Sequence, residues 1–259
     1  MDDERDGSQD QDAWELLVDG PGATCVLFDF DGPLCRLFPF GTSMAVAADL
    51  RRTLADDGAI QALSAAERTD KDPYMVLRAI HRVPQLGDLV RRLDARLTEG
   101  ELVAVSAALP TAGADRLVRW LSGRGVRLAV VTNNAADAAD RYLRRHDLRG
   151  CFEAIHGRGA DPGLMKPHPD VLRRALSGLG LPAGDAVMIG DTPADFAAAE
   201  EAGVAFIGYG RSHDKRRLLR DAGAKVVIAS YEPLLLRAAS GAEPGAARDR
   251  AGVDGPSSS

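Results

Sequence analysis

The chain has 259 residues, of which 45% are hydrophobic and 27% charged, a composition typical of a folded globular protein of one or two domains. Its net charge of −6, with no long Lys/Arg stripe, argues against nucleic acid as a partner, because binding a phosphate backbone needs clustered basic side chains. Three cysteines without a CxxC pattern argue against a disulfide framework or a zinc site, and no apolar run is long enough to span a membrane.

The two ends of the chain are polar. Residues 1–20 begin with an acidic stretch that predicts a disordered tail, and residues 240–259, rich in Ala, Gly, Ser and Pro, predict another. The first residues show no signal-peptide pattern. We therefore expect a cytoplasmic protein, monomeric or homodimeric, with no membrane partner.

Between the tails, short apolar runs bounded by Gly or Pro alternate with helical patterns, as expected for buried parallel strands joined by helices. The predicted strands lie at residues 24–30, 126–132, 154–156, 186–190, 204–207 and 225–228. The predicted helices lie at residues 116–121, 135–146, 169–179, 193–202 and 213–222. This alternation predicts an α/β fold with a doubly wound parallel sheet, formed by residues 21–39 and 111–235.

Residues 40–110 interrupt this alternation, because they contain no convincing strand pattern. Their amphipathic periodicity predicts four helices, at residues 44–54, 74–83, 86–97 and 101–109. The sequence thus predicts a helical subdomain inserted after the first strand.

The strongest local pattern is Asp29-Phe30-Asp31-Gly32, directly after the first predicted strand. Two carboxylates at the carboxyl end of a strand can face one ligand, and their oxygens suit a hard cation such as Mg²⁺. Gly32 permits the sharp turn that follows. Asp and Gly are also common in solvated turns, so this pattern alone leaves both interpretations open.

Three further polar groups follow predicted strands or lie in the loops beyond them. Thr132-Asn133 ends the second strand, where the hydroxyl could hold a phosphoryl oxygen or cap a helix. Lys166 lies in a Gly/Pro-flanked loop of a chain with only four lysines, which indicates either a need for a compact positive charge or an exposed loop lysine. Asp191 and Asp195, in the segment GDTPAD, form a second carboxylate pair that could bind a metal or cap the following helix.

In chain order, the segments DFDG, TN, KP and GDTPAD resemble the four motifs of the haloacid-dehalogenase-like (HAD) superfamily, over about residues 24–230. Residues 109–134 (LPTAGADRLVRWLSGRGVRLAVVTNN) are similar to the approach to the second motif in its phosphoglycolate-phosphatase-like branch. In that branch a helical cap lies between motifs one and two, where the insertion at residues 40–110 falls.

The resemblance implies a Mg²⁺-dependent phosphatase that hydrolyses a small phosphate monoester through an aspartyl-phosphate. It implies that Asp29 is the nucleophile and that Asp31 is the general acid and then the general base. Thr132 would bind the phosphoryl group with help from Asn133, and Lys166 would offset the negative charge of Asp29 and phosphate. The implied metal ligands are Asp29, the backbone carbonyl of Asp31, Asp191 and Asp195, the last directly or through water.

Several alternatives stay open at this point. Asp31 argues against a dehalogenase or a phosphonatase, which lack it, but a hexose-phosphate mutase keeps both carboxylates. A non-catalytic binding or regulatory protein of the same fold is also possible, because Pro33 stands where the family usually has Thr or Val. A receiver domain, which is also phosphorylated on an Asp, is disfavoured by the insertion and by the order of the motifs.

The substrate is the least determined feature. Phosphoglycolate is the leading expectation by resemblance alone, followed by sugar phosphates, nucleotides and pyrophosphate. His168 is close enough to Lys166 in the sequence to line the site. Some basic side chains could meet a second anionic group of the substrate or could simply lie on solvated helix faces: Arg36, Arg51, Arg52, Arg78, His81 and Arg82.

Overall fold

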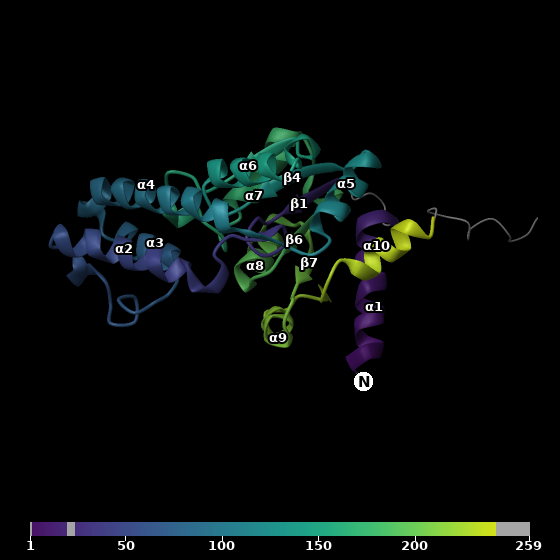
Figure 1. The fold of residues 1–259 in the computed structure, drawn as a ribbon, viewed down its shortest axis with the longest axis horizontal. Helices are drawn as coiled ribbons and strands as arrows, with labels where there is room; N and C mark the ends of the chain where they lie inside the picture. The colour runs from purple at the N-terminus through teal and green to yellow at the C-terminus, as the bar shows by residue number, and fades with distance from the viewer. Residues whose placement is uncertain (1, 20–23, 242–259) are drawn as a thin grey trace, which may run out of the picture.

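A computed structural model describes residues 2–19 and 24–241, and its centre is a single sheet with helices on both faces (Figure 1). The six strands of this sheet are parallel and lie in the order β5-β4-β1-β6-β7-β8. Their bounds are β1 Cys25–Phe28, β4 Arg127–Val131, β5 Ala154–His156, β6 Ala186–Gly190, β7 Ala205–Tyr209 and β8 Val226–Ile228. The predicted α/β fold with a parallel sheet is confirmed.

Two hydrophobic clusters sandwich the sheet. Alternate side chains of β1 point to opposite faces, so that Val26 and Phe28 join one cluster while Cys25 and Leu27 join the other. The first cluster is covered by α5 (Ala114–Gly123), α6 (Ala136–Arg145) and α10 (Glu232–Ala239). The second is covered by α7 (Asp170–Leu179) and α8 (Pro193–Ala202). The short helix α9 (His213–Asp221) follows β7.

Between the short antiparallel strands β2 (Cys35–Arg36) and β3 (Leu109–Pro110) lies a segment that we call the helical insertion. It contains α2 (Ser43–Asp56), α3 (Pro73–His81) and α4 (Gly87–Ala104), which form one end of the molecule in Figure 1. The helices enclose a hydrophobic cluster of their own, which also takes in Met165 from the α/β core. The prediction of two helices at residues 86–97 and 101–109 is wrong, because α4 continues through both regions to Ala104 and residues 109–110 form a strand.

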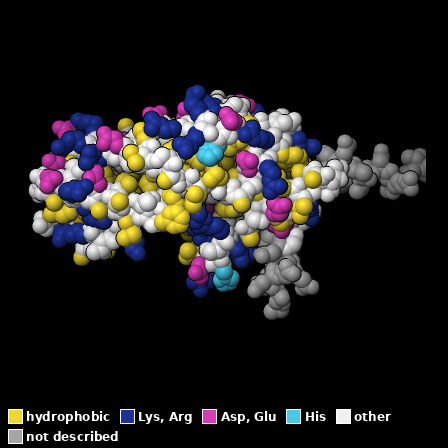
Figure 2. Space-filling model, in the orientation of Figure 1, with side chains coloured by type: hydrophobic (Ala, Val, Ile, Leu, Met, Phe, Trp, Pro, Cys, Tyr) yellow, Lys and Arg dark blue, Asp and Glu magenta, His cyan; other side chains and the backbone are white. Residues whose placement is uncertain are grey.

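Charged side chains of both signs are interspersed over the helical insertion on the face that Figure 2 draws. Several form ion pairs between neighbouring helices, among them Arg96 with Asp49 at 3.0 Å and Arg92 with Asp57. Exposed pairs of this kind contribute little stability, so the insertion is held together mainly by its apolar cluster.

The predicted disordered tail over residues 1–20 is wrong for the part that the structure describes. Residues Asp2–Trp14 form helix α1, and Glu15–Asp19 continue it as a π-helical turn. The acidic stretch contains few apolar residues, but Ala13, Trp14 and Leu17 are buried in the core cluster, and Trp14 packs against Trp120 with the rings tilted and their centroids 5.4 Å apart. Of the tail predicted over residues 240–259, residues 242–259 lie outside the described part. Among the helices described, none is both long and apolar enough to cross a membrane.

Candidate active site

Neighbouring strands bring the predicted site residues to one edge of the sheet. Strand β1 lies between β4 and β6, with Phe28 in register with Val130 and Ile189. Asp29, Thr132 and Asp191 follow these strand ends, and the backbone N–H of Asp29 still donates to the Ile189 carbonyl at 2.9 Å. The carboxyl edge of a parallel sheet is where doubly wound folds bind their ligands.

Lys166 reaches this edge from a loop that Asn133 holds in place. The Asn133 side chain accepts a hydrogen bond from the Lys166 backbone N–H at 2.8 Å and donates one to the Lys166 carbonyl at 3.1 Å. The Lys166 side chain is only 2% exposed, and its Nζ lies 2.9 Å from Asp29 Oδ1 and 2.6 Å from Asp195 Oδ1. Burial works against the charged amine, but the two carboxylates outweigh it and raise the pKa of Lys166, so it stays protonated.

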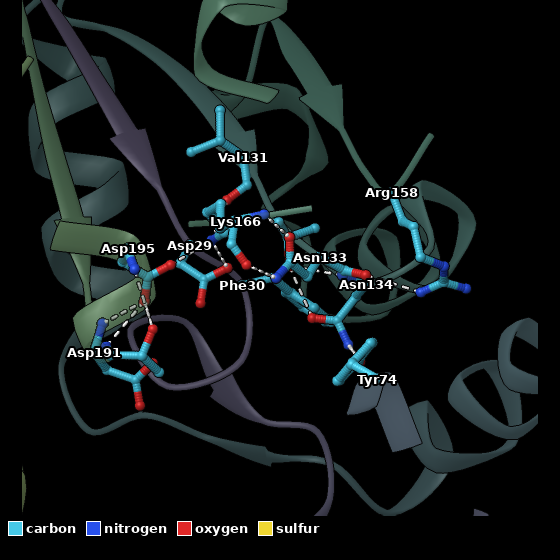
Figure 3. A network of polar contacts seen from close by, with 12 residues as sticks. Asp29, Phe30, Tyr74, Val131, Asn133, Asn134, Arg158, Lys166, Asp191 and Asp195 are labelled. Carbon is cyan, nitrogen blue, oxygen red and sulfur yellow. Dashed lines mark hydrogen bonds and ion pairs between the residues drawn. The ribbon is translucent and has the colours of Figure 1, made fainter. Parts of the chain in front are cut away.

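In Figure 3, Asp29, Asp191 and Asp195 lie on one side of Lys166, and Asn133 and Asn134 lie on the other. Asp195 serves two roles at once. Its Oδ2 accepts hydrogen bonds from the backbone N–H groups of Asp191 and Thr192 and from the Thr192 hydroxyl, which completes a capping box at the start of α8. Its Oδ1 contacts Lys166. Burial alone would raise the pKa of Asp195, but Lys166 and these donors lower it.

Asp191 differs from Asp195, because one of its carboxylate oxygens has no hydrogen-bond partner among the described residues. Its Oδ2 pairs with Lys215, whereas its buried Oδ1 has no hydrogen-bond partner among the described residues. A side chain at position 32 would place a Cβ 2.3 Å from the Asp191 Cγ, so Gly32, with a φ of +123°, is what allows this carboxylate to approach the first motif. Burial raises the pKa of Asp191 to about 7 and that of Asp29 to about 6.

These carboxylates fit a divalent cation. One oxygen each of the buried Asp29, Asp191 and Asp195 lies within 4.8 Å of the others, and Asp191 Oδ1 has no hydrogen-bond partner among the described residues. A set of oxygen donors with excess negative charge is what Mg²⁺ prefers. The Asp31 carboxylate lies outside this group of three, and its Oδ1 instead accepts from the Leu37 backbone N–H at 2.9 Å.

The turn after the first motif accommodates Pro33 without a visible conflict. Gly32, Leu34 and Cys35 use their backbone N–H groups within the turn, and the Pro33 carbonyl accepts from the buried Tyr231 hydroxyl at 3.1 Å.

Burial raises the pKa of Asp31, which favours its protonated form compared with an exposed carboxyl.

Thr132 is buried and lies in a hydrogen-bonded turn with Asn134. Its hydroxyl donates to Asn134 Oδ1 at 2.8 Å and accepts from the Asn134 backbone N–H at 3.2 Å. Capping of a helix by Thr132 or Asn133 is ruled out, because α6 begins only after Ala135. The Asn134 side chain also contacts Tyr74 and Glu101 of the helical insertion. Asn134 follows the TN motif directly and could have been suspected, but nothing in the sequence marks Glu101 or its partner Arg158.

A cavity of about 600 Å³ opens between the α/β core and the helical insertion. Its lining includes Asp29, Asp31, Lys166 and Asp195 from the core, and Lys71, Tyr74 and Arg78 from the insertion. Among the basic residues considered for substrate binding, Arg78 lines this cavity and Arg36 lines a smaller one of about 280 Å³ beside Asp31. The others bond elsewhere: Arg51 to the Asp70 carbonyl, Arg52 to Asp49, His81 to Asp161 and Arg82 to Glu67. His168 is exposed and lies outside the lining of this cavity.

Comparison with known proteins identifies the family of the chain. Residues 23–203 match the haloacid dehalogenase-like hydrolase family. A phosphoglycolate phosphatase of Rhodospirillum rubrum is 32% identical over 205 residues, covering 73% of this chain and 81% of the relative. One of Cereibacter sphaeroides is 30% identical over 191 residues, covering 70% of this chain and 82% of the relative.

Among solved structures, a predicted phosphoglycolate phosphatase of Haemophilus somnus 129PT has a TM-score of 0.60 at 18% identity, covering 84% of this chain and 99% of its own. This likeness concerns the fold. The family match, the relatives and the motif resemblance therefore agree, and the chain belongs to the haloacid dehalogenase-like hydrolases.

Proposed function

We propose that this chain is a Mg²⁺-dependent phosphatase that hydrolyses a small, phosphoglycolate-like phosphate monoester through an aspartyl-phosphate on Asp29. The observation that carries the proposal is the buried contact of Asp29 with Lys166, 2.9 Å long, on the wall of a cavity large enough for a small ester. The names of the relatives from Rhodospirillum rubrum and Cereibacter sphaeroides support phosphoglycolate as the first substrate to test.

In the first step, a carboxylate oxygen of Asp29 attacks phosphorus and the bond to the leaving oxygen breaks. Asp31 gives that oxygen its proton, for which the raised pKa of this half-buried carboxyl is suited. In the second step, Asp31 takes a proton from water, which attacks phosphorus and releases phosphate and Asp29. The covalent intermediate divides a very slow reaction into two easier steps.

The remaining side chains hold charge and geometry. Lys166 offsets the negative charge of Asp29 as the anionic phosphate approaches, and the Thr132 hydroxyl, which donates to Asn134 Oδ1 in this structure, would turn its hydrogen to a phosphoryl oxygen. Both polar atoms of the Asn133 side chain bond to the backbone of Lys166, so we assign Asn133 to positioning that loop. Asp29, Asp191 and the backbone carbonyl of Asp31 would hold Mg²⁺, and Asp195 would support the metal site directly or through water. The ion would supply Lewis-acid stabilisation of the phosphoryl oxygens.

The helical insertion would act as the cap that chooses the substrate, because it supplies the cavity wall opposite the carboxylates. Of the cavity-lining residues, Lys71 and Arg78 are its cationic side chains on this wall. A carboxylate or a second phosphate on the substrate would meet them there. This agrees with a phosphoglycolate-like ester better than with an uncharged leaving group.

The test is phosphate release, with Mg²⁺ present, from phosphoglycolate, a sugar phosphate, a nucleotide and pyrophosphate. We expect the wild type to release phosphate, with phosphoglycolate the best of the panel, and Asp29→Asn and Asp29→Ala to release none. Asp137→Asn, on the exposed side of α6, is the matched control and should behave as wild type. Turnover that survives in Asp29→Ala, with its fold checked by circular dichroism, would contradict the nucleophile assignment.

A further inference from the structure

The smaller cavity beside the first-motif turn has no ligand in the proposed chemistry. It measures about 280 Å³ and shares three lining residues with the larger cavity: Asp31, Phe38 and Thr192. These shared side chains form the partition between the two spaces. Asp29 and Lys166 line only the larger cavity, which is therefore where the reacting phosphate has to lie.

Three cationic side chains from two separate segments line the smaller cavity: Arg36, Arg211 and Lys215. Arg36 belongs to β2, where pairing with Leu109 of β3 fixes its backbone. Arg211 lies between β7 and α9, and Lys215 lies in the first turn of α9. The fold thus brings residues 36 and 211–215 together around one small space.

Two of these cations are unpaired. Arg36 is half-buried and Arg211 is exposed, and neither forms a hydrogen bond or an ion pair with any residue that the structure describes. Arginines elsewhere on the surface commonly find a carboxylate, as Arg82 does with Glu67. The two guanidinium groups at the smaller cavity are therefore available to an anion from outside the chain.

A buried hydroxyl at the same cavity also lacks a partner. The side chain of Tyr209 is only 6% exposed, and its ring stacks on that of Tyr231 with centroids 4.8 Å apart. Its hydroxyl makes no hydrogen bond with a described residue, although buried polar groups normally have a partner. Because Tyr209 lines the smaller cavity and a phenol can donate, it offers a donor beside the guanidinium groups.

The charge balance of the smaller cavity favours an anion. Its cations face two carboxylates, but Asp191 Oδ2 already pairs with Lys215, and Asp31 Oδ1 accepts from the Leu37 backbone N–H. A concave site with excess positive charge concentrates anions. Guanidinium groups bind two oxygens of a carboxylate or phosphate at once. The volume lies below that of cavities that enclose drug-sized ligands, so a small oxyanion fits best.

We propose that the smaller cavity binds a small oxyanion, a carboxylate or phosphate group, through Arg36, Arg211 and the Tyr209 hydroxyl. Two sources share this chemistry: a free anion such as inorganic phosphate, and the far end of the ester itself. We expect the free anion, because Lys71 and Arg78 already face the far end of the ester across the larger cavity. The inference goes beyond the proposed function, since binding here does not depend on turnover.

A titration with inorganic phosphate, with Mg²⁺ present, tests the site. The arginine Nε–H signals are followed by NMR and assigned from their loss in Arg36→Gln and Arg211→Gln. We expect the two signals to move together in the wild type and to give one Kd. Each variant should weaken the binding seen at the remaining arginine about ten-fold or more, the usual loss for a hydrogen bond to a charged group.

Two further variants sharpen this test. Tyr209→Phe keeps the ring that stacks on Tyr231 and removes only the hydroxyl, so it should weaken phosphate binding about three-fold or more. Arg145→Gln, at an exposed arginine in the last turn of α6, removes the same charge elsewhere and should leave the Kd unchanged. An unchanged Kd in both Arg36→Gln and Arg211→Gln would mean that phosphate only screens surface charge, and the proposal would be wrong.

A second arm distinguishes the two sources. Asp29→Asn, which should not turn over, is saturated with phosphoglycolate in the presence of Mg²⁺. If the ligand is a free anion, the Arg36 and Arg211 signals stay in place and still respond to added phosphate. If the ester fills the site, phosphoglycolate alone moves both signals and added phosphate has no further effect, which would keep the oxyanion site and assign it to the substrate.

Failure of the proposed function would look different. A wild type that releases phosphate from no ester would defeat the phosphatase assignment, but the phosphate titration of Arg36 and Arg211 would be unaffected. Arg36 and Arg211 signals that phosphate moves no more than that of Arg145 would defeat the oxyanion site, whatever the activity.

Discussion

At the scale of single residues, the site is built around one buried positive charge. Lys166 lies between Asp29 and Asp195, and the two carboxylates compensate the cost of taking its ammonium out of water. The same pairing keeps Asp29 ionised in a place where burial raises its pKa. Neither lysine nor carboxylate would be stable there alone, so stability and charge balance depend on the same atoms.

Replacing Lys166 with methionine should therefore damage the fold as well as the chemistry. The change leaves two buried carboxylates without their cation, which typically costs about 3–5 kcal/mol of the free energy of unfolding. Urea unfolding at pH 7 measures this loss, and phosphate release should vanish. Lys225→Met, at an exposed lysine, is the control and should change stability little. A urea midpoint for Lys166→Met equal to that of the wild type would show that the ion pairs of Lys166 contribute nothing to the free energy of unfolding.

The sequence made some of these residues predictable because each stands beside a strand end. Asp29, Thr132 and Asp191 follow apolar runs, and parallel strands bring their ends together. Glu101 and Arg158 have no such signal, because a charged residue on an amphipathic helix or in a loop normally faces solvent. Their burial depends on how the helical insertion sits against the core, which is a tertiary property.

At the scale of elements, α3 shows how a polar helix face can be misjudged. Its apolar side, with Val76, Leu77 and Ile80, packs within the helical insertion, as its periodicity indicates. Its polar side meets the core, where Arg78 bonds to the Lys166 carbonyl and His81 lies 3.0 Å from Asp161. Periodicity distinguishes apolar from polar faces but does not tell which polar face is solvated.

Helix α1 gives the clearest disagreement between sequence and structure at this scale. Few apolar residues anchor it, but Trp14 is only 3% exposed, and Gln9 Oε1 accepts from the Val227 backbone N–H at 2.8 Å. One large aromatic side chain can bury as much area as several aliphatic ones. The average polarity of a sequence window therefore does not reveal a buried apolar contact that one residue, here Trp14, makes alone.

Trp14→Ala should accordingly lower the free energy of unfolding by about 3 kcal/mol, the usual cost of removing a buried aromatic side chain. Phe40→Ala is the matched control, because Phe40 is 91% exposed and its removal should cost little. Chemical denaturation followed by circular dichroism measures both. Equal stability of Trp14→Ala and wild type would indicate that α1 does not dock on the core in solution.

At the scale of the whole molecule, two separately packed units meet at the site. The helical insertion has its own apolar cluster, which Met165 enters from the loop that carries Lys166. Lys166 is thus adjacent in sequence to a residue anchored in the other unit. Movement of the insertion is therefore coupled to Lys166 through this anchor.

Negative charge is in excess where these units meet, and a cation should therefore stabilise the folded chain. Asp29, Asp191 and Asp195 share the site with Lys166 and Lys215, and burial raises the pKa of the first two carboxyls. A raised carboxyl pKa means that ionisation at neutral pH opposes folding, and a bound divalent cation removes that opposition. Mg²⁺ that binds only the folded state at about 100 times its Kd adds about 2.7 kcal/mol.

For a chain of this size, that stabilisation corresponds to a rise in Tm of about 5–11 °C. The rise should follow the logarithm of the Mg²⁺ concentration and disappear with EDTA, together with phosphatase activity. Asp191→Asn should abolish the rise, because it removes a carboxylate whose Oδ1 has no protein partner among the described residues, whereas Asp214→Asn, at an exposed aspartate, should keep it. A Tm indifferent to Mg²⁺ in the wild type would place the cation outside this site, even if EDTA stopped turnover.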